Sequence, residues 1–189
     1  MSKTNTIIKD YLQSLIEVIN HFPIEELEQI FSVIINARES GNTVFICGNG
    51  GSWATSAHMV SDFSKNTRQP GMKRLKMIGL GDNIPNLTAY ANDEGYDRVF
   101  VEPLLSLMQP GDVLIAISGS GNSHNVLRAV EAAQEIGGTI VGLTGYQGGK
   151  LKAKADHCLI IPSDCLEMIE DFHMIINHIL TLCLRDGEY

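Results

Sequence analysis

Five short runs of apolar, often β-branched residues recur along the chain, and amphipathic stretches lie between most of them. The apolar runs occupy residues 43–47, 75–80, 112–118, 139–144 and 157–162. The stretches with helical spacing occupy roughly residues 52–64, 97–108, 123–136 and 165–184. Strands that are apolar on both faces and alternate with helices are typical of a parallel sheet covered on both sides. The sequence therefore predicts a single α/β domain in which helices flank a five-stranded parallel sheet.

Two further helices are expected before the first strand. Residues 4–21 repeat apolar side chains every three or four positions, and Pro23 ends that pattern. A second helical pattern follows, with acidic residues in its first turn and Gly41 after its end. An amphipathic pair of helices outside the sheet needs an apolar surface against it. We therefore expect residues 1–40 to form a helical hairpin that packs on the main domain, residues 41–189, or in an oligomer.

Charge and cysteine content narrow the classes of partner. The chain has 14 Lys and Arg against 22 Asp and Glu, a net charge of −8, which argues against a nucleic-acid binder that needs clustered basic residues. No apolar run approaches the ~18 residues that span a bilayer, and the N-terminus lacks the apolar segment of a signal peptide. The four cysteines form no CxxC motif, which favours free thiols in a reducing compartment. We expect a cytoplasmic protein that binds neither nucleic acid nor membrane.

A glycine-rich loop, CGNGGS at residues 47–52, joins the first strand to the following helix. Glycines let the backbone approach a ligand closely, and the free N–H groups at a helix start favour an anion. Trp53 stands where a dinucleotide fingerprint needs its third small residue, and no Gly-Lys-Ser/Thr of a P-loop follows. The loop therefore predicts an anion site without a nucleotide cofactor; a plain tight turn is the alternative.

A second loop of this kind, ISGSGNSHN at residues 117–125, follows the third strand. Hydroxyls of Ser118, Ser120 and Ser123 alternate with Gly119 and Gly121, so hydroxyl and backbone N–H groups can surround a phosphate without any lysine. Loops at the carboxyl ends of neighbouring parallel strands line one crevice. No sequence motif suggests recognition of adenine or ribose. The pair of loops therefore predicts a site for a phosphate monoester.

Two histidines and two carboxylates form a candidate acid–base or metal group. His58 and Asp62 are four residues apart and share a helix face, while Glu170 and His178 lie eight apart on the last helix. Such a set can bind a divalent metal or transfer protons. The alternative is that these side chains lie on solvated helix faces. His173, near Glu170, competes for the same role.

Three more polar residues stand near these motifs. Asn92 and Asp93 follow a short apolar helix, where they can serve as turn residues or contact a substrate hydroxyl. His124 opens the helix after the serine loop and could touch the substrate or lie at the rim.

Taken together, these segments resemble the SIS (sugar isomerase) family. The likeness extends over nearly the whole chain and rests on CGNGGSxxxxxH, ANDxGYxxxF, GDVLIAISGSGNSxNV, GLTGYxGGKL and IExxHxxxxHIL. The nearest branch is that of the phosphoheptose isomerases, aldose–ketose isomerases that convert sedoheptulose 7-phosphate to a D-glycero-D-manno-heptose 7-phosphate. The resemblance implies a flavodoxin-like or Rossmann-like three-layer SIS domain over residues 41–189. It also implies a homotetramer with active sites at subunit interfaces, and product heptose used for lipopolysaccharide or capsule.

The same resemblance assigns roles to residues. Asp62 and His178 would be catalytic and would transfer protons through an enediol. Zinc, which several members bind, would be held by His58, Asp62, Glu170 and His178. Substrate and phosphate would contact small or polar residues of the loops and helices: Asn49, Gly50, Gly51, Ser52, Asn92, Asp93, Ser118, Gly119, Ser120, Ser123 and Glu170.

The chain also departs from the family pattern. The family stretch D-A-x-H-x-x-x-E-L here has Thr55 and Asp62 in place of its Asp and Glu, and Glu170 replaces the usual Gln. The phosphate loop has Gly119 where Thr is usual. Two alternatives therefore stay open: an isomerase of a different phosphosugar, and a non-catalytic SIS protein that binds a phosphosugar or a protein partner, as one relative binds the bacterial replication initiator.

Overall fold

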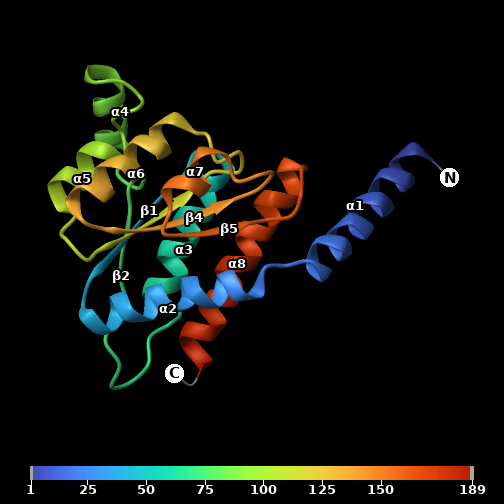
Figure 1. Ribbon diagram of the computed structural model, residues 1–189, viewed down its shortest axis with the longest axis horizontal. Coiled ribbons are helices and arrows are strands. Elements are labelled where there is room, and N and C mark those ends of the chain that lie inside the picture. Colours follow the sequence, from blue (N-terminus) through green and yellow to red (C-terminus); the bar gives the residue numbers. More distant parts are fainter. Residues whose placement is uncertain (1, 188–189) are drawn as a thin grey trace.

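The computed structural model describes residues 2–187 and has a five-stranded parallel sheet between two layers of helices (Figure 1). The strands are β1 (Thr43–Cys47), β2 (Lys76–Gly79), β3 (Val113–Ile117), β4 (Thr139–Thr144) and β5 (His157–Ile160). They lie in the order β2-β1-β3-β4-β5, and each neighbouring pair is parallel. All five predicted strands are confirmed, three of them with ends one or two residues shorter than expected.

Each helical layer covers one apolar face of the sheet. Successive strand residues point to opposite faces, so Val44 and Ile46 join one core while Phe45 and Cys47 join the other. The first core is closed by α2 (Ile24–Ser40), α3 (Gly51–Lys65) and α8 (Leu166–Asp186). The second is closed mainly by α5 (Val101–Leu107), α6 (His124–Ile136) and α7 (Gly149–Lys154). Burial on both faces explains why these strands are apolar throughout.

The helix predictions are confirmed for α3, α6 and α8 and need one correction. The helix predicted at 97–108 is shorter than expected, because α5 runs only from Val101 to Leu107, and a separate helix, α4 (Ile84–Asp93), precedes it. Gly95, with φ of +106°, turns the chain between the two helices. The Asn83 side chain caps α4 by accepting a hydrogen bond from the Asn86 amide.

The first helix, α1 (Lys3–Asn20), projects from the body of the molecule instead of folding back along α2 (Figure 1). Only its second half is anchored: Tyr11 donates to Asp171 Oδ2 at 2.6 Å, and just after the helix Phe22 stacks on Phe172. Its apolar stripe is exposed, with Ile7, Ile8, Leu12, Ile16 and Ile19 each at least half accessible. Whereas α2 packs on the sheet, the role of α1 as an oligomer contact stays a prediction. Across residues 2–187, no helix has the length and apolar character needed to cross a membrane.

Candidate active site

The two predicted loops begin side by side at one edge of the sheet. Cys47 at the end of β1 is in register with Ala116 near the end of β3, so CGNGGS and SGSGNS leave neighbouring strands at the same level. The strand order also reverses direction here, because β2 lies on one side of β1 and β3 on the other. Open parallel sheets bind ligands at this switch point. The fold thus places both loops where a ligand is expected.

Both loops lead into helix starts that lack a side-chain cap. Gly50 precedes α3 and Ser123 precedes α6, and within the described chain neither helix start is capped by a hydrogen bond from its N-cap side chain. The first N–H groups of a helix have no partner in the helix itself, and the helix dipole favours negative charge there. These two helix starts can therefore donate hydrogen bonds to a ligand in the crevice.

The serine loop has the form of a small cradle. Ser118 Oγ donates to Ser123 Oγ at 3.0 Å, and the Asn122 amide lies 3.2 Å from Ser120 Oγ. Ser118 is buried, Ser123 is half-buried and Ser120 is exposed, so the hydroxyls line the loop from its floor to its rim. This arrangement supports the predicted phosphate site.

An amide pair joins the two loops. Asn49 Nδ2 donates to Asn125 Oδ1 at 2.7 Å, and Asn125 Nδ2 donates back to Asn49 Oδ1 at 2.9 Å. Tyr96 donates its hydroxyl to the same Asn49 oxygen at 2.9 Å. A cavity of about 430 Å³ opens beside this pair, lined by Asn49, Tyr96, Asp97, Ser123, His124 and Asn125. His124 therefore lies where it can meet a ligand. Tyr96 and Asn125 belong to segments that resemble the family, but no role was predicted for them.

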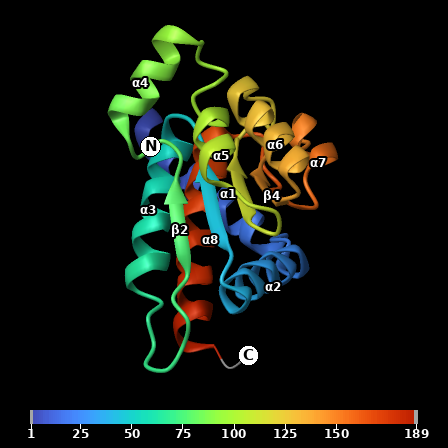
Figure 2. The same cartoon turned by 90° about the vertical axis from the view of Figure 1, so that its left-hand side faces the viewer.

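A second group of chemically active side chains lies between α3 and α8, which run side by side (Figure 2). His58 Nε2 is 3.2 Å from Asp62 Oδ2, and the rings of His58 and His178 meet edge to face at 5.3 Å. One ligand atom from each of the three residues lies within 4.8 Å of the others. Two imidazoles and a carboxylate at this spacing fit a divalent metal such as zinc, with a coordination position left open. The structure thus brings together three of the four predicted residues, His58, Asp62 and His178.

The fourth member, Glu170, lies elsewhere on α8. An ideal Cβ built on Gly51 would be 2.5 Å from both carboxylate oxygens of Glu170, so this side chain covers the start of α3. His178 comes eight residues later on the same helix, a distance of about 12 Å along the axis. Glu170 of the same chain therefore faces the glycine loop, not the His58, Asp62 and His178 group.

Asn92 and Asp93 lie at the end of α4, where both side chains are exposed. Asn92 Nδ2 donates to Asp93 Oδ1 at 2.6 Å, so the two side chains contact each other. Their part in substrate binding stays a prediction.

Comparison with known proteins decides the family. The model of the SIS domain family matches residues 9–145. The chain belongs to the SIS domain family. One relative of this SIS protein is the phosphoheptose isomerase of Aliarcobacter butzleri, which is 36% identical over 95% of this chain and 94% of the relative. Another is the phosphoheptose isomerase of Helicobacter pylori strain P12, which is 39% identical over 85% of this chain and 83% of the relative. The phosphoheptose isomerase GmhA of Neisseria gonorrhoeae has a similar structure, with a TM-score of 0.89 and 29% identity over 96% and 98% of the two chains. The predicted family and fold class are confirmed.

Two asparagines of the SIS protein, unforeseen in the sequence, bind the Asp62 carboxylate. Asn66 Nδ2 donates to Asp62 Oδ1 and Asn177 Nδ2 donates to Asp62 Oδ2, each at 2.9 Å. Asn66 follows Asp62 by one helical turn, a spacing that could have suggested this contact. Asn177 comes from α8, and only the packing of α8 on α3 brings it near.

His173 of the SIS protein is a core residue. Its ring is fully buried, with Nε2 3.5 Å from the carbonyl oxygen of Thr144. Burial lowers the pKa of His173 to about 4. His173 therefore does not compete with Glu170 for a role in the acid–base or metal group.

This burial gives His173 a measurable effect on stability. Because the pKa of His173 is about 4 in the folded state and about 6.5 in the unfolded state, the unfolded state binds more protons between these values. The contribution is present above pH 6.5 and is lost as the pH falls towards 4, up to about 3 kcal/mol. Urea unfolding of wild type and His173→Leu at pH 7.5 and 4.5 should show a smaller loss in the variant. Equal losses would contradict this assignment.

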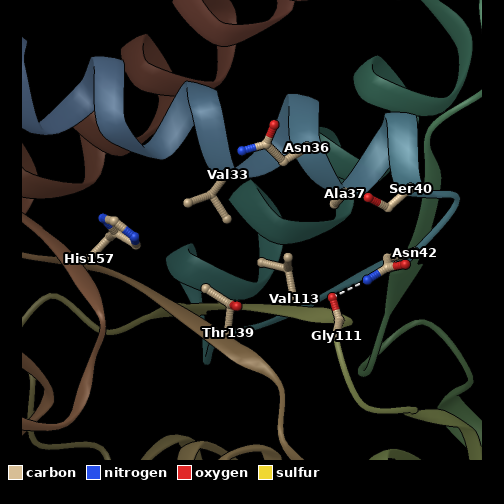
Figure 3. Close-up of a pocket in the computed structure, with 9 residues that line it drawn as sticks. All are labelled: Val33, Asn36, Ala37, Ser40, Asn42, Gly111, Val113, Thr139 and His157. Atoms are coloured by element: carbon tan, nitrogen blue, oxygen red, sulfur yellow. Dashed lines mark hydrogen bonds between the residues drawn. The ribbon is translucent and has the colours of Figure 1, made fainter.

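A separate cavity of about 260 Å³ lies at the opposite edge of the SIS domain (Figure 3). It is enclosed by α2 and by the amino ends of three strands, at Val113, Thr139 and His157. Asn42 donates to the carbonyl oxygen of Gly111 on its rim (Figure 3). Since the predicted loops leave the carboxyl ends of the strands, this cavity is not part of the candidate active site.

Proposed function

We propose that this SIS protein is a phosphoheptose isomerase that interconverts sedoheptulose 7-phosphate and D-glycero-D-manno-heptose 7-phosphate. The observation that carries the proposal is the grouping of His58, Asp62 and His178, because a phosphosugar-binding protein without catalysis needs no such acid–base set. The relatives that share most of its length bear the same enzyme name.

The phosphate of the sugar is bound by the serine loop. The hydroxyls of Ser118, Ser120 and Ser123 and the open start of α6 donate hydrogen bonds to its oxygens. The first loop, with Asn49, Gly50, Gly51 and Ser52, contacts the sugar hydroxyls. Binding of the remote phosphate holds the open-chain sugar with its reacting carbons fixed.

Proton transfer is assigned to Asp62 and His178. The Asp62 carboxylate removes a proton from the carbon beside the carbonyl group, which leaves an enediol, and the proton returns to the neighbouring carbon. His178 moves the hydroxyl proton between the two oxygens. The net change is one hydrogen moved between the adjacent carbons and one moved between their oxygens, with no external oxidant or reductant. Each acid–base contribution of this kind is worth about 10²–10⁴-fold in rate.

Zinc is the proposed metal, held by His58, Asp62 and His178. When bound it supplies Lewis-acid polarisation of the substrate's carbonyl oxygen. Glu170 remains the proposed fourth ligand. We assign the fourth position to the Glu170 carboxylate of a second copy, because that of the same chain lies about 12 Å along α8 from His178.

The length of α3 supports an active site shared between copies. Asp62 comes eleven residues after Gly51, about 16 Å along the helix axis. An extended seven-carbon sugar phosphate is about 10 Å long, given carbon–carbon bonds of about 1.5 Å. One substrate therefore cannot reach the serine loop and the Asp62 of the same chain. The exposed apolar stripe of α1 offers a surface for association. We expect a homotetramer; a monomeric mass in light scattering would contradict this.

The compartment proposed for the enzyme is the cytoplasm. Its four cysteines are all free thiols, which fits a reducing environment. Its proposed partners are the phosphorylated heptose and other copies of itself.

The test is an isomerisation assay on sedoheptulose 7-phosphate, with and without added zinc, in which the aldose product is identified by NMR. The expected result is turnover that rises with zinc in metal-stripped protein. Binding of the sugar phosphate without turnover would contradict the proposal and favour the second candidate, an isomerase of another phosphosugar. The presence of the Glu170 carboxylate beside the sugar loop favours that candidate, because it changes which hydroxyls can bind there. A panel of five-, six- and seven-carbon sugar phosphates distinguishes the two.

A further inference from the structure

We infer that Asn177 is a positioning residue that holds the Asp62 carboxylate toward His58 and His178. Asn177 is fully buried in the contact between α8 and α3. Its Nδ2 donates to Asp62 Oδ2 at 2.9 Å, the same oxygen that lies 3.2 Å from His58 Nε2. The next residue along α8 is His178. One short segment of α8 thus supplies both a member of the acid–base group and the donor that fixes its carboxylate.

The amide of Asn177 can face Asp62 in only one orientation. Its Nδ2 group bonds to Asp62 Oδ2 and approaches Met174 Sδ at 3.7 Å. Its Oδ1 is buried and has no hydrogen-bond partner within residues 2–187. Rotation of the amide by 180° would satisfy neither side, because it would place the carbonyl oxygen against the carboxylate. A buried acceptor without a partner is rare in folded proteins, and here the bond to Asp62 accounts for its position.

The two amides together restrict the carboxylate of Asp62. Asn66 binds Oδ1 from the end of α3, and Asn177 binds Oδ2 from α8. Asn66 is exposed and belongs to the same helix as Asp62, so it cannot fix Asp62 relative to α8. Asn177 is the contact that ties the carboxylate to the helix that carries His178. Removal of this contact frees Asp62 Oδ2 to turn away from the two imidazoles.

Thr181 provides a matched control. It lies one turn beyond Asn177 on α8, is also buried, and has a hydroxyl without a partner in the described part of the chain. Thr181→Val and Asn177→Leu both replace a buried polar group of α8 with an apolar group of similar size. Only the second removes a contact to Asp62.

The kinetic test rests on the proposed isomerase activity. Asn177→Leu is expected to lower kcat about 10–100-fold, the usual effect of losing a residue that orients a reacting or ligating group. KM should stay within about twofold, since the serine loop is remote. Thr181→Val should keep kcat within about twofold. If both variants lose activity equally, Asn177 has only a structural role. Asn177→Ala, which removes the amide donor and adds no charge, should show the same loss if Asn177→Leu does not fold.

A crystal structure of the folded Asn177 variant gives a readout that needs no activity. The expected result is an Asp62 carboxylate that has left His58, while the Thr181→Val structure keeps that contact. An unmoved Asp62 would overturn the inference. If wild type fails to isomerise any phosphosugar, the proposed function fails, and the position of Asp62 in these structures still decides the role of Asn177.

Discussion

Asp62→Asn is expected to lower kcat for the heptose phosphate about 10²–10⁴-fold, the range lost with a general base. Asparagine has the shape of aspartate, so the helices α3 and α8 keep their packing, but its amide cannot accept a proton from carbon. KM should change little, because the proposed phosphate contacts come from the serine loop and not from Asp62. Steady-state kinetics with the NMR assay separate kcat from KM.

The control for this experiment is Asp10→Asn, the same chemical change on the exposed face of α1. It should leave both kcat and KM at wild-type values. A kcat of Asp62→Asn within threefold of wild type would reject Asp62 as the base. Glu170 of a second copy would then be the next candidate for the base.

Gly121→Ala is expected to raise KM for the sugar phosphate at least tenfold, a loss of about 1.4 kcal/mol in binding. Gly121 has φ of +64°, where residues with a Cβ are strained, and an added Cβ would overlap the carbonyl oxygen of Gly148. The Gly121 amide also donates to the carbonyl oxygen of Ser118 at 2.9 Å. The loop must therefore shift, and its hydroxyls move with it. Titration with inorganic phosphate and steady-state kinetics measure the loss.

The matched control is Gly71→Ala. Gly71 has φ of +82°, but an added Cβ would meet no atom of the described chain within 4 Å. This variant should lose only the ~1 kcal/mol of backbone strain in thermal unfolding and keep its KM. If Gly121→Ala binds phosphate as tightly as Gly71→Ala does, the serine loop is not the phosphate site.

Much of the fold is visible in the sequence because burial on both faces makes the strands apolar throughout. Helices with a long amphipathic pattern, such as α3 and α8, are visible for the same reason. The short helix α7 is not, since six residues carry too little pattern and depend on tertiary packing. The projection of α1 also cannot be read from its stripe, because a stripe predicts that an apolar face will be covered without saying by what.

The candidate site also contains residues that the sequence predicts and residues that it does not. Glycines and serines directly after a strand predict a loop that binds an anion. The four-residue spacing of His58 and Asp62 predicts that both side chains lie on one face of a helix. Asn177 could not be found, because its contact depends on the angle at which α8 crosses α3. The separation of Glu170 from this group could have been calculated from the sequence. His178 comes eight residues later on the same helix, about 12 Å along its axis, which is too far for one metal ion within a single chain.

The position of Glu170 gives the crevice two ends that differ in charge. Two helix starts open toward it, but the one at α3 already has a carboxylate beside it, while the one at α6 has only the neutral hydroxyls of the serine loop. Negative charge is therefore repelled from the first and attracted to the second. A sugar with a single phosphate can enter only one way round. A sugar with a phosphate at each end would be excluded by charge in either orientation.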